Sequence, residues 1–272
     1  MMAVTQPASD TSPRSFRRRA TIVGVTLVVF LLASRLQLLL YGIPWYRNLY
    51  ERFPFYVPET LKSSLAILLV LATVIVLRRT SLAGAISELG IRRPEGRMIG
   101  ILLLATLPMW LVFAFTTPLV TDFGPATVFY LAFVSPLAEE VVFRGFAFRQ
   151  LYRYASLGFW PSILLTSAVF SVVHLAKASS PGQMLGIAAI TFVGGAFFAW
   201  LFVRWKDQLL APLLIHVLMN LAWQIFAVGE TAFAGWLPTI MQASVLVLAV
   251  VLTVVSQRRW TGRQGQHESP TA

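Results

Sequence analysis

Residues 126–149 read ATVFYLAFVSPLAEEVVFRGFAFR, an apolar run that is long enough to cross a lipid bilayer. A transmembrane helix needs about 20 consecutive apolar residues, and the only charged residues before the final arginine of this run are Glu139, Glu140 and Arg144. A charged side chain in the middle of a bilayer is costly unless it pairs with another group or faces a cavity. The run therefore predicts a transmembrane helix whose charged residues face the interior of a helical bundle.

Apolar runs of comparable length recur along the whole chain. Hydrophobic residues make up 57% of the 272 positions and charged residues only 12%, against about 25% charged residues in soluble domains. The predicted transmembrane spans lie at 20–41, 61–77, 98–117, 126–149, 159–177, 183–203, 208–228 and 233–256. The composition and the runs predict an all-α, polytopic membrane helix bundle with about eight transmembrane helices.

The domain organisation predicted from these runs is simple. Residues 1–19 are expected to form a flexible basic cytoplasmic tail, residues 20–256 a single membrane domain, and residues 257–272 a short polar cytoplasmic tail. The chain has no cysteine, which excludes disulfides, thiolate zinc sites and cysteine nucleophiles.

The net charge of +11 gathers on one predicted side of the membrane. The basic residues assigned to that side are Arg14, Arg17, Arg18, Arg19, Arg78, Arg79, Arg92, Arg93, Arg97, Arg149, Arg153, Arg204, Lys206, Arg258, Arg259 and Arg263. The opposite side has Arg47, Arg52, Lys62 and, at a span end, Lys177. Because cytoplasmic loops collect Lys and Arg, both termini are predicted to be cytoplasmic, and the basic balance requires no nucleic acid partner. The chain is expected to be a multi-pass integral membrane protein, in the inner membrane if its source is prokaryotic.

Two segments outside the spans are expected to lie at the membrane surface. Residues 80–97 mix apolar and charged residues and predict an amphipathic element on the cytoplasmic side. Tyr41, Trp45, Tyr46 and Tyr50 are typical of an aromatic belt at the opposite interface.

The ionisable residues inside the spans fall on three helices. They are Glu139, Glu140, Arg144, His174 and His216, whereas Glu59 and the other acidic residues are assigned to loops or tails. Arg35 lies at the outer end of the first span, where a long side chain can reach the interface. Because five such groups cannot be scattered over surfaces that face lipid, we expect them to meet inside the bundle.

Helical spacing assigns the two glutamates different tasks. Glu140 and Arg144 are four residues apart with the acid first, the favourable order for an ion pair on one face. Glu139 is rotated by about 100° from Glu140, so it is the carboxylate predicted to do chemistry. Pro136 removes a hydrogen bond to the Ala132 carbonyl and is expected to kink the helix beside Glu139.

Each of these residues also has a structural interpretation. A single histidine or asparagine inside a membrane usually forms a hydrogen bond between helices, which would suffice for His174, His216 and Asn220. His216 and Asn220, four residues apart, present one polar edge. Phe170 by itself predicts only packing, and the Gly194–Gly195 pair predicts a close approach of two helices.

Three short motifs, in chain order, carry a family resemblance. They read EEVVFR at 139–144, FSVVH at 170–174 and HVLMN at 216–220. This pattern, Glu-Glu-x-x-x-Arg, Phe-x-x-x-His and His-x-x-x-Asn, resembles the CAAX-protease and bacteriocin-processing family of intramembrane peptidases. This family is also called Abi and includes the prenyl-protein CAAX endopeptidases. The resemblance covers about residues 125–228.

The resemblance implies a reaction and a role for each motif residue. Glu139 with His174 would activate a water molecule, and His216 with Asn220 would stabilise the oxyanion, while Glu140, Arg144 and Phe170 would support the site. The expected activity is that of an intramembrane endopeptidase, and its substrate would be a membrane-associated or prenylated CAAX-type protein or peptide.

The motif residues are compatible with a zinc-dependent mechanism or with one that uses no metal. Glu139, His174 and His216 form a possible zinc ligand set with an open water position, although no His-Glu-x-x-His motif occurs. We favour a glutamate mechanism without a metal.

Two other classes of function remain as alternatives. One is a non-catalytic membrane immunity or scaffold protein of the same fold, and the other is a proton-coupled transporter.

Overall fold

The computed structural model describes residues 13–122, 124–229 and 231–267. These residues are arranged in helices, and the part of the chain that is described contains no strand, only an isolated bridge between Leu119 and Phe226. The elements are α1 (Pro13–Ser34), α2 (Leu36–Tyr41), α3 (Pro44–Arg52), α4 (Tyr56–Arg78), α5 (Leu82–Glu88), α6 (Gly96–Thr116), α7 (Pro125–Phe129), the π-helix η1 (Tyr130–Val134), α8 (Ser135–Glu140), the π-helices η2 (Val141–Phe148) and η3 (Gln150–Tyr154), α9 (Phe159–His174), the 3-10 helix η4 (Leu175–Lys177), α10 (Pro181–Arg204), α11 (Leu210–Ile225) and α12 (Trp236–His267). The predicted all-α class is confirmed.

The described helices include five that are long and apolar enough to cross a membrane. They are Tyr56–Arg78, Gly96–Thr116, Pro125–Tyr154, Pro181–Arg204 and Trp236–Arg258. Two shorter apolar helices, Phe159–His174 and Leu210–Ile225, pack among them. The protein is an integral membrane protein, while the count of eight spans and the orientation of the termini stay predictions.

The first predicted span, 20–41, does not form a single helix. α1 ends at Ser34, and Arg35 lies outside helical geometry with φ −114° and ψ 12° before α2 begins. The Ser34 hydroxyl donates to the Phe30 carbonyl at 2.6 Å, a local bond of the kind that bends or ends a helix. The uninterrupted span is therefore wrong at this position.

The two ends of the membrane domain are also helical beyond their predicted limits. α1 begins at Pro13, and residues 1–12 of the predicted tail lie outside the described residues. α12 continues to His267, so most of the predicted polar tail 257–272 is an extension of the last helix. Residues 268–272 lie outside the described part.

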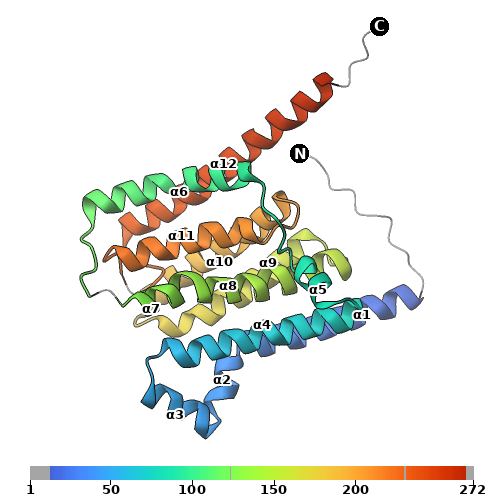
Figure 1. Cartoon of the computed structure of the whole chain (residues 1–272), viewed down its shortest axis with the longest axis horizontal. Helices are drawn as coiled ribbons and strands as arrows, with labels where there is room; N and C mark the ends of the chain where they lie inside the picture. The colour runs from blue at the N-terminus through green and yellow to red at the C-terminus, as the bar shows by residue number, and fades with distance from the viewer. Residues whose placement is uncertain (1–12, 123, 230, 268–272) are drawn as a thin grey trace.

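The long helix Pro125–Tyr154 is the centre of the bundle. It contacts α1 and α4 on one side and α9, α10 and α11 on the other, and α6 and α12 pack beyond α11. Figure 1 shows α8 lying between α4 and α11. All residues of η2, Val141–Phe148, are buried, which explains why this segment tolerates so few charged residues.

Pro136 changes the hydrogen-bond register of this central helix. Because the proline has no N–H to offer the Ala132 carbonyl, the chain widens into the π-helix η1, and the Ser135 N–H bonds the Tyr130 carbonyl five residues earlier. Such π segments concentrate at functional sites. The distortion expected at Pro136 is therefore present as a local widening of the helix.

One end of the bundle is closed by contacts that we call the basic collar, formed by Arg92, Arg93, Arg149, Arg153 and Lys206 with their partners. Arg153 donates to both oxygens of Asp207 at 3.0 Å, and Arg149 donates to the Glu88 carbonyl. The Gln208 side chain donates to the Arg92 and Arg93 carbonyls at 3.1 Å. These bonds join the segment before α6, the end of the central helix at η3 and the segment before α11, which confirms that they lie at one end. Lys206 pairs with Glu95 at 3.6 Å.

The predicted surface element 80–97 is helical only over α5. After Glu88 the chain turns inward, and Leu89 is buried with only 1% of its surface exposed. The predicted amphipathic element therefore lies at the surface only in part, because the burial of Leu89 and the turn at Gly90 bring the chain into the bundle before α6 begins at Gly96. Tyr46 likewise is not at an exposed interface: it is fully buried, and its hydroxyl donates to the Pro58 carbonyl at 3.0 Å.

Gly90 allows the close approach that closes the collar. Its φ is +85°, and a Cβ built there would lie 2.3 Å from the Asp207 carbonyl oxygen. We expect Gly90→Ala to destabilise the protein by at least about 2 kcal/mol, since it combines left-handed strain with a backbone clash. Thermal unfolding in detergent measures the effect. Gly100→Ala is the control, because its Cβ would meet nothing within 4 Å; equal melting temperatures for the two variants would contradict the prediction.

Candidate active site

Glu140 and Arg144 form a buried ion pair, as their spacing predicts. The Arg144 Nη1 donates to Glu140 Oε1 at 3.0 Å, and the two side chains are 2% and 0% exposed. The guanidinium lies over the Phe170 ring at 4.6 Å and the Phe198 ring at 5.1 Å. Two aromatic faces thus stabilise a cation whose charge is already balanced by Glu140.

His216 connects the two glutamates. Its Nδ1 donates to Glu140 Oε1 at 2.8 Å, and its Nε2 lies 3.8 Å from Glu139 Oε2. The ring is stacked on Phe198 at 5.1 Å. Because the Glu140 carboxylate is the acceptor, Nδ1 carries the hydrogen, and the other nitrogen of the ring faces Glu139.

Glu139 has a different environment from its neighbour. Its side chain is 26% exposed, whereas that of Glu140 is 0% exposed. The Ser135 hydroxyl, one helical turn earlier, donates to Glu139 Oε1 at 3.0 Å. The division that helical rotation predicts, one carboxylate neutralised and one facing open space, is present in the fold.

His174 lies at the end of α9 and is held by its own helix. Its Nδ1 is 2.7 Å from the Phe170 carbonyl oxygen, and its ring packs on the Phe170 ring at 4.5 Å. A carbonyl oxygen only accepts, so Nδ1 carries the hydrogen and Nε2 is the basic nitrogen. Phe170 therefore does more than pack, because it orients both His174 and Arg144.

Asn220 is bonded to the widened part of the central helix. Its Nδ2 donates to the Leu131 carbonyl at 3.1 Å. In the register of η1, the partner of that carbonyl would be the N–H of residue 136, and Pro136 has none. The asparagine therefore supplies a hydrogen bond that the proline removed, and it joins α11 to η1.

Two cavities meet at these residues. The wide cavity has a volume of about 510 Å³ and the narrow cavity about 250 Å³, and both are lined by Leu131, Ser135, Glu139 and His174. His216 and Asn220 line the narrow cavity alone. The acid, the two imidazoles and the amide of the predicted site therefore surround connected space, while Glu140 and Arg144 lie behind it.

The two glycines of α10 have different environments. A Cβ on Gly195 would lie 3.2 Å from Ser167, so this glycine allows the close contact of α10 with α9. The Gly195 carbonyl also accepts from Arg144 at 3.4 Å. A Cβ on Gly194 would meet nothing within 4 Å, because Gly194 lines the narrow cavity. The predicted close approach is confirmed for Gly195 and wrong for Gly194.

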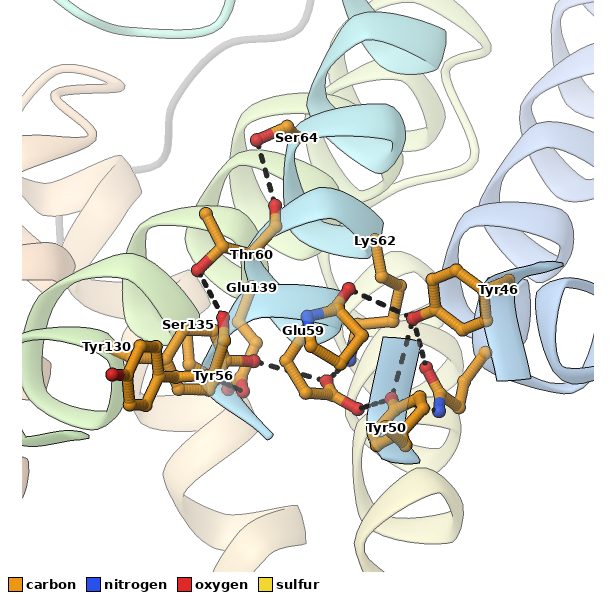
Figure 2. Close-up of polar contacts among 12 residues, drawn as sticks. Tyr46, Tyr50, Tyr56, Glu59, Thr60, Lys62, Ser64, Tyr130, Ser135 and Glu139 are labelled. Atoms are coloured by element: carbon orange, nitrogen blue, oxygen red, sulfur yellow. Dashed lines mark hydrogen bonds and ion pairs between the residues drawn. The ribbon is translucent and has the colours of Figure 1, made fainter. Parts of the chain in front are cut away.

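A second polar group, which the sequence analysis placed in a loop, lines the wide cavity. Glu59 lies in the first turn of α4, where it pairs with Lys62 and accepts from the Tyr130 hydroxyl at 3.2 Å. Figure 2 shows this cluster beside Ser135 and Glu139. Its signal was present, since Pro58 followed by an acid and, three residues later, a lysine is typical of a helix start.

Tyr50 holds Glu59 from the other side. Its hydroxyl donates to Glu59 Oε1 at 2.6 Å. Burial raises the pKa of the Tyr50 hydroxyl well above its ordinary value, and the hydrogen bond to Glu59 raises that pKa further. Tyr50 therefore stays protonated and remains a donor over the whole physiological pH range.

The zinc alternative depends on how the possible ligands are arranged. Over residues 13–122, 124–229 and 231–267, no group of three or more His, Cys, Asp or Glu side chains is placed to hold a metal ion. The set Glu139, His174 and His216 is thus not gathered as a ligand group in this fold. A mechanism without a metal stays a proposal.

Comparison with protein families identifies the central part of the chain. Residues 103–222 match the model of the type II CAAX prenyl endopeptidase Rce1-like family. This segment is similar to the Rce1-like family. The resemblance that the three motifs indicate is confirmed, because the Rce1-like segment contains all three and extends from α6 into α11. Comparison of the chain with curated proteins and with solved structures finds no match.

Proposed function

We propose that this protein is an intramembrane endopeptidase that hydrolyses a peptide bond of a membrane-associated protein or peptide. The observation that carries the proposal is the contrast between the two adjacent glutamates. Glu140 is fully buried and paired with Arg144, whereas Glu139 lies at the junction of two cavities. The match to the Rce1-like family, which is a family of proteases, supports peptide hydrolysis as the reaction class.

In the proposed mechanism, Glu139 and His174 act on water. Glu139 takes a proton from a water molecule as the water oxygen attacks the carbonyl carbon of the peptide, and His174 holds that water through Nε2. The tetrahedral intermediate then collapses, the C–N bond breaks, and the carboxyl of Glu139 returns the proton to the leaving amine. A positioned general base of this kind contributes about 100- to 10,000-fold in rate.

His216 and Asn220 are proposed to face the oxyanion of the intermediate. The Asn220 amide has two N–H groups, and only one is needed for the Leu131 carbonyl. His216 would offer its Nε2, which faces Glu139, as the second donor when both ring nitrogens carry hydrogen. Donors that already point at the developing charge lower the barrier, and removal of one such donor by mutation raises it by about 3–4 kcal/mol. No metal takes part in this proposal.

The experiment that tests the function compares membranes from cells with the wild-type protein and with Glu139→Ala. Mass spectrometry of new protein termini should find at least one cleavage that disappears in the variant, while the variant accumulates in the membrane at the wild-type level. A prenylated CAAX-type substrate is the first class to examine, because the family is named for it. Full complementation by Glu139→Ala would favour a scaffold, and ion flux that depends on Glu139 in proteoliposomes would favour a transporter.

Gly194 offers a way to test the narrow cavity as part of the substrate site. We expect Gly194→Leu to reduce kcat/KM for peptide cleavage about tenfold or more, because a single extra methylene in a binding pocket already has that effect and leucine adds a larger group. The Cβ of the new side chain would meet nothing within 4 Å at a position that lines the narrow cavity. Gly100→Leu is the matched control, since its position is exposed on α6 and equally uncrowded. An unchanged kcat/KM for Gly194→Leu would show that substrate does not use this cavity.

A further inference from the structure

Both cavities reach Glu139 from the same end of the bundle. The wide cavity is lined by Arg35 after α1, by Tyr50 on α3 and by Glu59 at the start of α4. The narrow cavity is lined by Trp223 near the end of α11 and by Thr231 in the following loop. These parts of the chain lie at one end of the bundle. α1 contacts α4 and runs antiparallel to it, and α10 contacts α11 in the same way. Both cavities are also lined by Leu131 and Ser135, near the start of the central helix.

The other end of the bundle offers no residue to either cavity. The collar segments around Glu88, Arg153 and Asp207 line neither the wide nor the narrow cavity. These segments are joined to one another by the Arg153–Asp207 and Arg149–Glu88 pairs. Below them, the η2 segment is buried along its whole length. Access to Glu139 is therefore asymmetric along the axis of the bundle.

The same axis carries a strong asymmetry of charge. α1 begins and α12 ends at the collar end, as Figure 1 shows by the positions of α1, α5 and α12. The collar end has the arginines of the N-terminal part of α1, the α4–α6 connection and the α10–α11 connection, whereas the cavity end has Arg35, Arg47, Arg52 and Lys62. Positive charge is retained on the cytoplasmic side of a membrane, which makes the collar end the cytoplasmic end.

We infer that the active site opens to the extracytoplasmic side, and that its substrate is a polypeptide segment exposed on, or anchored in, the outer leaflet. This inference rests on the proposed peptidase function for its substrate and on the fold for its direction. The inference therefore favours an exported or outward-facing membrane protein as the substrate over the prenylated CAAX-type class that the family name suggests, because a prenylated protein is attached to the cytoplasmic face.

The wall of the wide cavity suits such an entry. Its mouth has polar groups on three elements, namely Tyr50 on α3, the Glu59–Lys62 pair on α4 and Tyr130 on η1. Figure 2 shows this cluster between α3 and Ser135 with Glu139. An extended peptide below the membrane surface needs partners for its backbone N–H and C=O groups, and a hydrolase needs a path for water. The polar wall supplies both from the outer interface to the catalytic glutamate.

The chain has no cysteine, which permits a direct test with single-cysteine variants of the full-length protein. Ala176 is exposed at the wide cavity, and Ala83 is exposed on α5 at the collar end, so Ala176→Cys and Ala83→Cys are matched substitutions. Intact cells are treated with a membrane-impermeant maleimide, and labelling is compared with that of permeabilised cells. We expect Ala176→Cys to be labelled in intact cells and Ala83→Cys to be labelled only after permeabilisation.

A third variant tests whether the opening leads to the site itself. Ser135 lines both cavities and bonds Glu139, so we expect Ser135→Cys to react with a small charged methanethiosulfonate reagent added to intact cells. The inference is overturned if Ser135→Cys fails to react from the outside, if Ala176→Cys is labelled only after permeabilisation, or if Ala83→Cys is labelled in intact cells.

Labelling requires no catalysis, so this test is separate from the test of the proposed function. If the labelling follows the expected pattern but no cleavage depends on Glu139, the outward-facing cavity is supported and the proposed peptidase function fails. The reverse result, cleavage with inward labelling, would keep the peptidase and assign its substrate to the cytoplasmic face.

Discussion

Glu139→Gln is expected to reduce the rate of peptide cleavage by about 100- to 10,000-fold, the range that a general base contributes. The substitution keeps the shape of the side chain and its contact with the Ser135 hydroxyl but removes the basic oxygen that takes the proton from water. The protein should still fold, because Glu139 is 26% exposed at a cavity and is not part of the buried ion pair. The measurement is the initial cleavage rate of a substrate peptide by purified protein in proteoliposomes, with the amount of folded protein matched by gel filtration.

A matched control distinguishes a loss of chemistry from a loss of charge. Glu51 is exposed on α3 and is not among the residues that line either cavity, so Glu51→Gln should retain the wild-type rate. If Glu139→Gln keeps a rate within a few-fold of the wild type, Glu139 is not the base, and the proposed mechanism fails even if cleavage occurs.

Arg144→Ala is expected to destabilise the protein by about 3–5 kcal/mol, the cost of removing one partner from a buried ion pair. The Glu140 carboxylate would remain fully buried, with the His216 ring as its remaining hydrogen-bond partner among those described here. The space beneath the Phe170 and Phe198 rings would also lose the guanidinium that fills it. The expected result is a large loss of folded yield and a lower midpoint of unfolding in a detergent titration with sodium dodecyl sulfate.

Two further variants decide whether the buried charge is the cause. In the double variant Glu140→Gln with Arg144→Met, no charge is left without a partner, so its stability should exceed that of Arg144→Ala. Lys206→Ala removes an exposed partner of Glu95, whose ion pair should contribute about 1 kcal/mol or less. A loss for Lys206→Ala as large as that for Arg144→Ala would contradict the explanation.

The two predictions concern adjacent glutamates, Glu139 directly and Glu140 through its partner Arg144, and their different outcomes follow from rotation along one helix. Consecutive residues of an α-helix are about 100° apart, so Glu140 faces Arg144 and the aromatic rings while Glu139 faces the cavities. The glutamate pair therefore divides into a member held in an ion pair and a member that faces the cavities. That division could be deduced from spacing, because the pairing of Glu140 with Arg144 is a contact within a single helix.

Contacts between helices were less accessible from the sequence. The apolar spans and their polar residues predict that Glu139, His174, His216 and Asn220 meet, and their common cavities agree with this. The sequence does not indicate that His216 bonds Glu140 through Nδ1, or that Asn220 replaces the hydrogen bond lost at Pro136. These contacts depend on the relative depth and rotation of separate helices, which side-chain packing sets.

The misplaced elements have the same origin. Glu59 was assigned to a loop, and the break at Arg35 was not foreseen, since hydropathy alone averages over individual residues. The helix start at Tyr56 brings Glu59 to Tyr130, and the Ser34 hydroxyl helps to end α1 one residue before Arg35. An average of hydropathy over a whole span cannot detect helix boundaries set by single residues.

The amino-acid order by itself determined the helical class, the membrane environment and the Glu140–Arg144 pair, because hydrophobic length and the spacing of residues along one helix are local properties. The tertiary structure alone decided where the two cavities lie beside Glu139, which end of the bundle they open to, and which polar groups line the way. Those features arise from the packing of helices that are far apart in the chain, where the close contact at Gly195 and the closure at Gly90 set distances that no local pattern contains.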